Sequence, residues 1–452
     1  MRSLPATTAA LAIGALSLGC TTGTETPDPS KLEPWAHALD SAAFPTALAS
    51  GPDGSLFIGG LFSGEADFGG GALTAGDPDS MFLAYYDPNG QHIMSGATGA
   101  ADTVTATAIG PDGTSCAVGN ITGSMTFPDG TLNGSGDGWL ACFDATGAAL
   151  FSKLIRSELM IDLQSVAIAP NGNIVIGLET DRTVDFGAGP ASSSNEAIAV
   201  IAELTPEGDP LWDYRIFANP LFPVQVGVGP DGSVAFTTGF EAPISFGLET
   251  FTTGTVIGKL DATGKPLWGV VDAANVYGYL RFRSFSVDEG GNVVVAGWGV
   301  ADGVDFAGLS VPQGNSDAMF VAKISPEGQG LWIRPITAGD DLGLLVFAAP
   351  APGGDVLVAA NSYSPVDFGA GPVETSPAGQ ALALARLSPD GAVEQTLSVS
   401  SDGGAAVWYI AADPKGQAVL MGIGSGDVQF GPAGGTELNM AQGGPFLARV
   451  AF

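Results

Sequence analysis

The sequence predicts an all-β fold, a seven-bladed β-propeller with four antiparallel strands in each blade and a ring closed by the N-terminal strand. Three observations predict it. A unit recurs every 59 to 63 residues along the 452-residue chain, each unit holds short apolar runs separated by turn residues, and both ends of the repeated region hold an incomplete unit. Repetition at a fixed step is the sequence signature of repeat architectures, and a ring of small sheets is the propeller.

Three columns of residues keep the same step through the chain, and we number the units repeats 1 to 7 after the first of them. The first column closes the first turn: Gly54, Gly113, Gly172, Gly232, Gly291, Gly354 and Gly416. The second is a phenylalanine: Phe68, Phe127, Phe186, Phe246, Phe306, Phe368 and Phe430. The third is always small: Ala84, Ala141, Ala202, Gly258, Ala322, Ala385 and Ala448. We expect the small column to give a tryptophan of a neighbouring strand or blade room to lie flat.

Each unit is predicted to form four strands. The first ends in a tight turn, as in Val226–Gly232, where Pro-Asp-Gly supplies the fixed and the positive φ angles that such a turn needs. The second resembles Asn292–Gly297, the third Met319–Ile324, and the fourth opens with Leu331-Trp332. Several runs are apolar at consecutive positions, which is typical of sheets covered on both faces. A β-solenoid is the alternative, but its turns are usually shorter and lack paired hairpins.

The ends of the repeated region predict how the ring closes. Glu33–Leu39 carries Trp35 and matches a fourth strand, although no first three strands precede it. Pro445–Phe452 matches a third strand, and no fourth strand follows it in the sequence. We therefore expect the N-terminal strand to complete the seventh blade, so that residues 33–452 form one propeller domain.

The first residues predict export. Residues 1–19 have one arginine and an apolar core, Ala9–Leu18, that is too short to span a membrane and fits a secretory signal peptide. With Gly19-Cys20 this stretch resembles the bacterial lipoprotein signal, although Ser17-Leu18 inverts the usual order. The resemblance implies lipidation at Cys20 and an anchor in the cell envelope, at the outer membrane or cell surface. An ordinary signal peptide with an incidental cysteine is the alternative, and the polar residues 20–32 are predicted to be a flexible tether.

Charge excludes some partners. The net charge is −32, from 47 acidic and 15 basic residues. Nucleic acid requires a basic surface, so it is not expected as a partner, and adhesion to anionic lipid is not expected apart from the lipid anchor. We expect a monomer that binds protein or carbohydrate without a cofactor.

Two further cysteines, Cys116 and Cys142, fall on the predicted second and third strands of one blade. In an exported protein a disulfide across these strands is one interpretation, and two buried thiols are the other. Cys142 lies in a column that is otherwise polar or aromatic: Tyr85, Glu203, Lys259, Lys323, Arg386 and Arg449.

The repeat also resembles a known family. Val-Asp-Phe-Gly-Ala-Gly, the stretch Asp317–Lys323 and Gly-x-x-Leu-Trp are similar to the seven-bladed β-propeller repeats of the SBBP type in bacterial exported proteins. The resemblance covers the chain after Lys31 and implies the fold and an extracytoplasmic setting, but no activity. Leu260–Trp268 resembles the tryptophan-docking repeat of quinoprotein-like propellers, which implies a possible scaffold role in outer-membrane assembly.

The sequence offers little for catalysis, and we expect no catalytic residues and no metal site. The two histidines, His37 and His92, fall on predicted outer strands, so a Ser-His-Asp triad or a histidine zinc site is hard to build. Asp67, Asp185, Asp305 and Asp367 precede the phenylalanine column. We interpret them as turn-fixing residues rather than cation ligands. A carboxylate-dependent enzyme acting on polysaccharide stays open as the alternative function, since pairing of acids in space is not visible in a sequence.

The connections indicate where a ligand would bind. Tight turns are expected at one end of each blade, and long connections such as Leu61–Ser80 and Trp298–Asp317 at the other. Binding residues favour loops on a rigid scaffold. The connection Asn275–Arg283 holds two tyrosines and two arginines, and such residues dominate binding hot spots. We hypothesise that Tyr277, Tyr279 and Arg281 line a ligand or partner site; the alternative is that they fill the gap between blades and pair with local acids.

Overall fold

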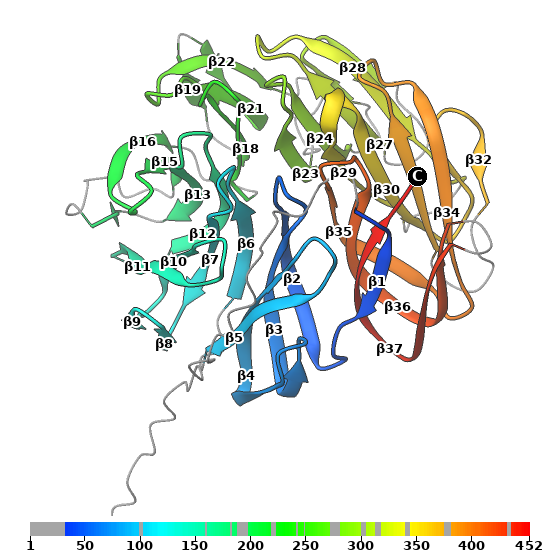
Figure 1. The fold of residues 1–452 in the computed structure, drawn as a ribbon. Coiled ribbons are helices and arrows are strands. Elements are labelled where there is room, and N and C mark those ends of the chain that lie inside the picture. Colours follow the sequence, from blue (N-terminus) through cyan, green and yellow to red (C-terminus); the bar gives the residue numbers. More distant parts are fainter. Residues whose placement is uncertain are drawn as a thin grey trace, which may run out of the picture.

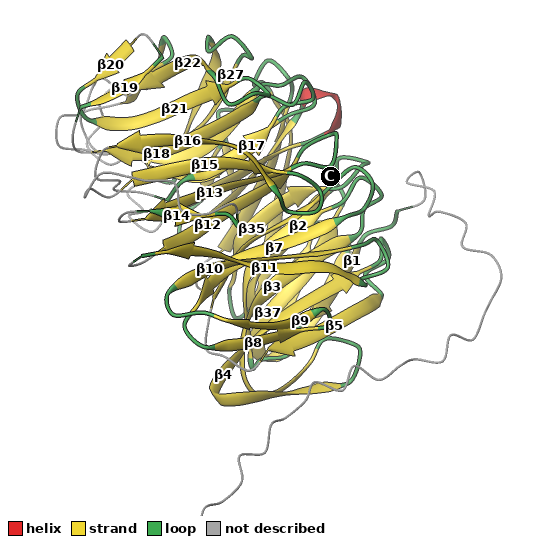
Figure 2. Ribbon diagram, turned by 90° about the vertical axis from the view of Figure 1, so that its left-hand side faces the viewer, coloured by secondary structure: helices red, strands yellow, loops and turns green. Residues whose placement is uncertain are grey.

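The computed structural model describes most of the chain after the predicted leader and tether. The described residues are 32–98, 103–158, 161–180, 183–187, 198–217, 223–240, 243–247, 249–271, 281–299, 304–311, 318–339, 344–374, 381–431 and 435–452. Nearly every regular element among them is a β-strand (Figures 1 and 2). No helix in this part of the chain is both long and apolar enough to cross a membrane.

The first turn of each repeat folds as its sequence predicts. In repeat 1, Gly51 N–H donates to the Ser55 carbonyl (2.8 Å) and Gly54 N–H to the Gly51 carbonyl (2.9 Å). Gly54 has a φ of 89°, which only glycine adopts without steric cost. Asp53 Oδ1 accepts a bond from Ser55 N–H (2.9 Å), which fixes the turn from its own side chain. The same backbone bonds recur at the other first turns, so the strands on either side keep one register.

Repeats 1 to 3 form separate antiparallel sheets. Repeat 1 is β2 (Ala43–Ser50), β3 (Leu56–Asp67), β4 (Ala72–Tyr86) and β5 (His92–Thr98). Repeat 2 is β6 (Thr103–Ile109), β7 (Ser115–Ile121), β10 (Asp137–Phe143) and β11 (Ala149–Ser157), with an extra hairpin of β8 (Ser124–Phe127) and β9 (Gly130–Asn133). Repeat 3 is β12 (Ile161–Ile168), β13 (Ile174–Thr180), β15 (Ile198–Leu204) and β16 (Pro210–Phe217), with the short β14 (Val184–Asp185).

Repeats 4 and 5 follow the same plan. Repeat 4 is β17 (Gln225–Val228), β18 (Val234–Phe240), β21 (Gly254–Leu260) and β22 (Pro266–Val271), with the hairpin β19 (Ile244–Phe246) and β20 (Glu249–Phe251). Repeat 5 is β23 (Arg281–Val287), β24 (Val293–Gly299), β27 (Ala318–Ile324) and β28 (Gly330–Ile336), with the hairpin β25 (Val304–Phe306) and β26 (Leu309–Val311).

Repeats 6 and 7 are joined in one eight-stranded sheet because the end of β36 pairs with β34. Repeat 6 is β29 (Leu345–Pro350), β30 (Val356–Ser362), β33 (Ala381–Leu387) and β34 (Val393–Ser401), with β31 (Val366–Asp367), β32 (Pro372–Val373) and one 3-10 turn, η2 (Pro352–Gly354). Repeat 7 is β35 (Ala405–Ala412), β36 (Ala418–Phe430) and β37 (Thr436–Val450). Its fourth strand comes from the other end of the chain: β1 (Trp35–Ala38) pairs with β37, Trp35 opposite Arg449.

The connections that the sequence predicts to be long loops contain further hairpins in several repeats. β8–β9, β19–β20, β25–β26 and β31–β32 are such hairpins, and in repeat 1 β3 and β4 continue their pairing to Asp67 opposite Ala72. Figure 1 places β8, β9 and β32 at the periphery. The first strand of each of these segments ends at the phenylalanine of the second column or one residue before it. All seven phenylalanines are buried. Each buried ring packs the segment against its sheet, which explains why phenylalanine recurs at this position in every repeat.

Some of these segments also cover the preceding repeat. Val184 and Asp185 of β14 pair with β11 of repeat 2, and Thr337 bridges to Asp367 of repeat 6. Since an unpaired outer strand is a site of aggregation, adding a segment of the next repeat protects the edge.

The first strands of the repeats are neighbours. β2 contacts β6, β6 contacts β12, and the series continues through β17, β23, β29 and β35, which in turn contacts β2. Polar bonds join them at equivalent places: Thr46 Oγ1 donates to the Val104 carbonyl (2.6 Å) and Thr105 Oγ1 to the Leu163 carbonyl (2.6 Å). Apolar side chains of successive sheets share one cluster, such as Leu140 of repeat 2 with Ile176 of repeat 3. Full burial of such a side chain contributes about 1.5–3 kcal/mol to folding, so packing between sheets is a main source of stability.

The tryptophans of the fourth strands pack differently from the sequence expectation. They lie on a turn glycine of the next repeat: a methyl group at Gly264 would be 2.6 Å from Trp212, and one at Gly328 would be 2.7 Å from Trp268. The small column has another reason in repeat 4, where a methyl group at Gly258 would be 2.4 Å from Phe236 and 3.2 Å from Phe246. The small residue there makes room for phenylalanines, not for tryptophan.

Candidate functional site

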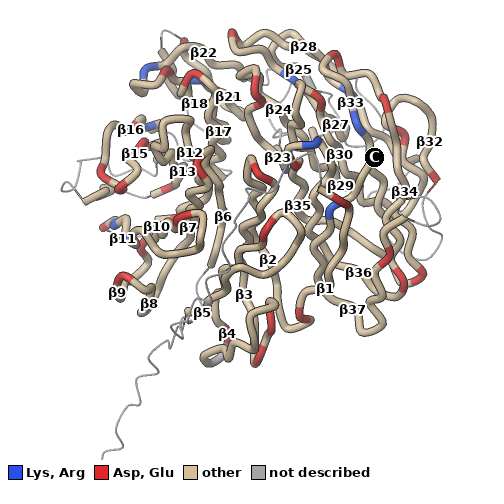
Figure 3. The backbone as a smooth tube through the Cα atoms, in the orientation of Figure 1, with Lys and Arg blue, Asp and Glu red and all other residues tan. Residues whose placement is uncertain are grey.

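At the turn end of the sheets, one third-strand residue of each repeat faces the junction with the next repeat. We call these residues the junction column: Tyr85, Cys142, Glu203, Lys259, Lys323, Arg386 and Arg449. The four cations donate to main-chain carbonyls of the following repeat. Lys259 reaches the Pro326 carbonyl (3.3 Å), Lys323 the Gly354 carbonyl (2.7 Å), Arg386 the Gly416 carbonyl, and Arg449 the Gly54 carbonyl (2.7 Å). Lysine and arginine are few in this chain (Figure 3), and several of them join repeats.

Two of these cations belong to buried ion pairs. Lys323 Nζ lies 2.8 Å from Asp288 Oδ2, and Arg449 Nε lies 3.0 Å from Asp413 Oδ2, with all four side chains buried. Burial acts to raise the pKa of Asp288, but hydrogen bonds from Lys323 and Asn292 outweigh it and hold that pKa below its ordinary value. Removing one partner of such a pair leaves a buried charge without compensation, which costs about 3–5 kcal/mol. These junctions are therefore built as rigid joints.

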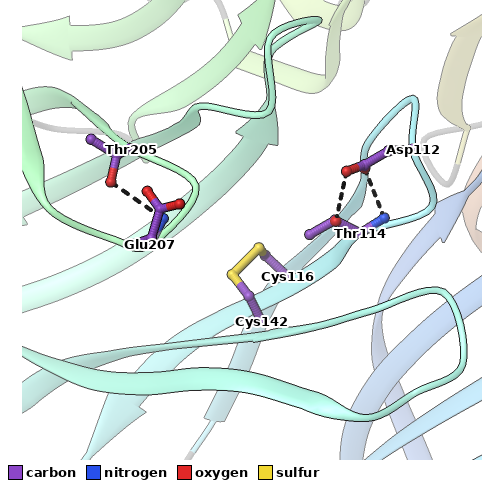
Figure 4. Close-up of a disulfide and its surroundings, with 6 residues drawn as sticks. All are labelled: Asp112, Thr114, Cys116, Cys142, Thr205 and Glu207. Atoms are coloured by element: carbon purple, nitrogen blue, oxygen red, sulfur yellow. Dashed lines mark hydrogen bonds between the residues drawn. A yellow bond between two sulfur atoms is a disulfide. The ribbon is translucent and has the colours of Figure 1, made fainter.

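The junction between repeats 2 and 3 is built with a disulfide and a lysine. Cys116 and Cys142 stand opposite each other on β7 and β10 and are joined by a disulfide, shown in Figure 4 beside the Asp112–Thr114 turn and the Thr205–Glu207 turn. The crossing cation comes from the fourth strand instead: Lys153 Nζ donates to the carbonyls of Phe186 (2.8 Å) and Gly208 (2.5 Å) of repeat 3. Burial lowers the pKa of Lys153.

The junction between repeats 3 and 4 differs, because its column residue is a carboxylate. Glu203 is buried, 4% exposed, and accepts a bond from Asn173 Nδ2 (2.6 Å). A pocket of about 550 Å³ opens beside it. Its lining comes from three turns and two strands: Pro170, Asn171, Asn173, Glu203, Leu211, Trp212, Pro230, Asp231, Gly232, Ala262 and Thr263.

Trp212, in the wall of this pocket, also departs from its equivalents. The indole N–H of Trp35 donates to the Pro88 carbonyl (3.4 Å), that of Trp268 to Pro326 (2.7 Å), and that of Trp332 to Pro389 (2.9 Å). Trp212 Nε1 is buried and has no hydrogen-bond partner. At the place of those prolines the next repeat has Ala262. The pocket is thus lined by a buried carboxylate, Glu203, and by a tryptophan that lacks the indole hydrogen bond of its equivalents.

Most of the sequence-predicted binding residues lie outside the described part of the chain. Cys20, Tyr277 and Tyr279 are among those residues. Arg281 begins β23, where its backbone pairs with Trp298. The structure therefore neither brings these side chains together nor separates them.

The residues weighed for catalysis or metal binding have structural roles. Asp67 Oδ1 accepts bonds from Gly69 N–H (2.8 Å) and Gly71 N–H (3.0 Å), and Asp185 and Asp367 hold their turns in the same way, which confirms the turn-fixing interpretation for these three. His37 lies on β1 and His92 begins β5, and burial lowers the pKa of both. Among the described residues, no group of three or more His, Cys, Asp or Glu is placed to hold a metal ion.

The sequence analysis missed the pocket between repeats 3 and 4. A signal for it existed in the junction column, where Glu203 is the one carboxylate and the four neighbours in later repeats are cations. That column does not show a cavity until the repeats are placed side by side.

Comparison with known proteins assigns neither a family nor an activity to this chain. The sequence matches no known family, and no characterised protein matches it in sequence. Solved structures similar to this chain include puromycin hydrolase, at 12% identity and a TM-score of 0.47 over 87% of this chain and 53% of that one. The Neurospora crassa Pan2 WD40 domain is similar at 10% identity and 0.38 over 91% and 90%, and Agrobacterium tumefaciens regucalcin, a calcium-binding protein, at 14% and 0.36 over 72% and 85%. These three structures contain β-propeller-like folds, but each TM-score is below 0.5; the all-β repeat architecture of this chain rests on its own strands and their pairing.

Proposed function

We propose that this chain is a seven-bladed β-propeller, exported and anchored in the bacterial cell envelope by a lipid at Cys20, that works as a binding or scaffolding module. The observation that carries the binding role is the pocket between repeats 3 and 4. It combines a buried carboxylate, an aromatic and apolar wall and a volume of about 550 Å³ on rigid sheets. Concave sites with a few placed polar groups on a rigid scaffold are typical of ligand binding.

The series of neighbouring first strands and the pairing of β1 with β37 support seven blades and ring closure. Arg449 adds a joint between the last repeat and the first, since it donates to Gly54. Deleting residues 1–40 should leave β37 as an open edge and lower the unfolding temperature or cause aggregation. An unchanged unfolding temperature would contradict the closure.

The anchor is tested separately. Cys20→Ser should convert a protein of the detergent phase into a soluble exported one. Intact-mass analysis that finds an unmodified mature chain would remove the lipid from the proposal.

A binding role is favoured over a carboxylate-dependent enzyme because the acids of the pocket already hold structure. Asp231 accepts bonds from Ser233, and Glu203 accepts one from Asn173. The test presents the mature chain, released from its anchor by Cys20→Ser, with envelope polysaccharides and envelope proteins, and measures saturable binding and product formation. Saturable binding without turnover is expected; turnover of a polysaccharide would favour the enzyme.

Tyr277, Tyr279 and Arg281 stay in the proposal as contact residues for a ligand or partner. Tyr279→Ala and Arg281→Ala should each weaken binding of a partner by about 1 kcal/mol or more without unfolding the protein. Unchanged affinity in both variants would exclude that surface.

A further inference from the structure

We propose that the pocket between repeats 3 and 4 binds a primary alkylammonium group, as on a lysine side chain of a partner protein or on a free polyamine. The inference rests on the proposed function as a binding module and names the ligand chemistry of that site. Because the repeats are equivalent, the junction column can be compared from one junction to the next. Four of its residues are cations of the chain itself, whereas the residue between repeats 3 and 4 is the carboxylate of Glu203.

The equivalent places show what this position binds. Lys323, Arg386 and Arg449 each donate to the carbonyl of the next first-turn glycine, namely Gly354, Gly416 and Gly54. Between repeats 3 and 4 the equivalent glycine is Gly232, and it lines the pocket. The column residue at this junction is Glu203, so a carboxylate stands where those three junctions have a cation that donates to the glycine carbonyl.

Glu203 supplies the negative charge that would hold such a cation. The residue is 4% exposed, and among the described residues its hydrogen bond comes from Asn173, a donor without charge. Asp231, on the opposite turn, lines the same pocket and accepts its bonds from Ser233. A buried charge is stabilised when an opposite charge pairs with it, so a bound ammonium would complete the junction as Lys323 does for Asp288.

The apolar wall suits the alkyl part of the ligand. Leu211 and Trp212 line the pocket beside Pro170 and Pro230. An alkyl stem lies on such surfaces while its charged end is hydrogen-bonded, and an indole face attracts a cation. The net charge of −32 would draw a basic partner to this protein.

The test uses the full mature chain with Cys20→Ser and titrates it with Nα-acetyl-lysine amide at neutral pH and low salt, by calorimetry or NMR. Glu203→Gln keeps the shape and removes the charge, and it should weaken binding about tenfold or more, as expected for loss of a hydrogen bond to a charged group. Glu203→Lys should abolish binding because the chain then supplies its own cation. Glu249→Gln removes one charge from exposed β20 and is the matched control that should bind like the parent.

Three further measurements make the result decisive. Nε-acetylated lysine amide, which has lost the ammonium charge, should not bind. Trp212→Phe should weaken binding of both the lysine amide and putrescine, because phenylalanine attracts a cation less than an indole does; tighter binding of putrescine than of the lysine amide by the parent would identify a polyamine as the source. Denaturant unfolding of each variant shows whether lost binding reflects an unfolded chain. If Glu203→Lys does not fold, binding by Trp212→Phe still tests the site.

Equal affinity of Glu203→Gln and the parent for the lysine amide overturns the proposal, and so does an equal loss in Glu249→Gln, which would indicate general charge attraction. The proposed function fails in a different way. If an envelope component binds saturably and Glu203→Gln leaves that affinity unchanged, the binding module stands and the alkylammonium site alone is wrong.

Discussion

The joint between repeats 5 and 6 and the joint between repeats 3 and 4 are built from equivalent positions and have opposite properties. In the first, Lys323 pairs with Asp288 and donates to the Gly354 carbonyl, so an internal ion pair and a main-chain bond join the two repeats. In the second, Glu203 is held by Asn173 and a pocket remains. The residue in the junction column therefore differs in its role between the two joints: Lys323 stabilises one with an ion pair, and Glu203 lines a pocket in the other.

Two of the four column cations have a buried carboxylate partner in the first turn of their own repeat. Asp288 and Asp413 stand in their first turns where repeats 1, 3 and 6 have Gly51, Ala169 and Ala351. The two aspartates occur in the repeats whose column residues are Lys323 and Arg449, their partners. A buried carboxylate thus occurs together with the cation that compensates it.

The largest effect is expected from breaking a filled joint. Arg449→Met removes the cation from Asp413 and the bond to Gly54, so a buried carboxylate is left unpaired. The free energy of unfolding should fall by about 3–5 kcal/mol, measured by urea denaturation. A loss below about 1 kcal/mol would show that the pair is dispensable, and Arg156→Met on the exposed part of β11 is the matched control.

A smaller effect is expected from the covalent joint. Replacing Cys116 and Cys142 together by alanine removes a disulfide that spans 26 residues. Such a bond contributes about 2–4 kcal/mol, mainly by restricting the unfolded chain. Denaturation of the variant, compared with the parent under oxidising and reducing conditions, measures it. Identical midpoints in all three samples would contradict the prediction.

A third prediction concerns the tryptophan contact that both kinds of joint share. Gly328→Ala would put a methyl group 2.7 Å from the Trp268 ring at a residue with a φ of 84°. Gly353→Ala is the matched control, with a φ of 79° and no atom within 4 Å of the new methyl group. The first variant should lose about 1–3 kcal/mol more than the second because of overpacking. Equal thermal stability of the two would mean that Trp268 moves aside freely.

The smallest effect is expected in the pH dependence. The folded-state pKa of Asp288 is lowered, because its hydrogen bonds outweigh burial. Its ionised form therefore stabilises the fold above the unfolded-state pKa of about 3.9, and that stabilisation is lost as pH falls through the lower folded-state pKa. Asp288→Asn should flatten the fall of stability in this acidic range, measured by denaturation at several pH values. Glu249→Gln should keep the parent slope; an Asp288→Asn curve parallel to the parent would refute the assignment.

The sequence predicted the strands and their order well, because turn glycines such as Gly54 and buried columns such as Phe68 report local requirements. The role of Asp67 followed from its place before two glycines, Gly69 and Gly71. The hairpins at the periphery were not predicted, since segments such as β8–β9 are short and carry polar residues that also suit loops. The pocket beside Glu203 could not be predicted, because a cavity depends on how far side chains of two repeats reach toward each other, and sequence spacing does not contain that distance.

The pairing of the first strand with the last has a consequence for how the chain folds. Most strand pairs join neighbours within one repeat, and such local contacts form quickly. The contacts of the N-terminal segment are different: Lys415 donates to the Leu32 carbonyl across 383 positions. Domains of a growing or translocating chain fold from the N-terminus onward, so β1 must wait for its partner β37 while the repeats between them assemble. The slowest step is then the pairing of β1 with β37. A chain that ends before β37 keeps an unpaired sheet edge, which is exposed to proteases and to pairing with another such chain.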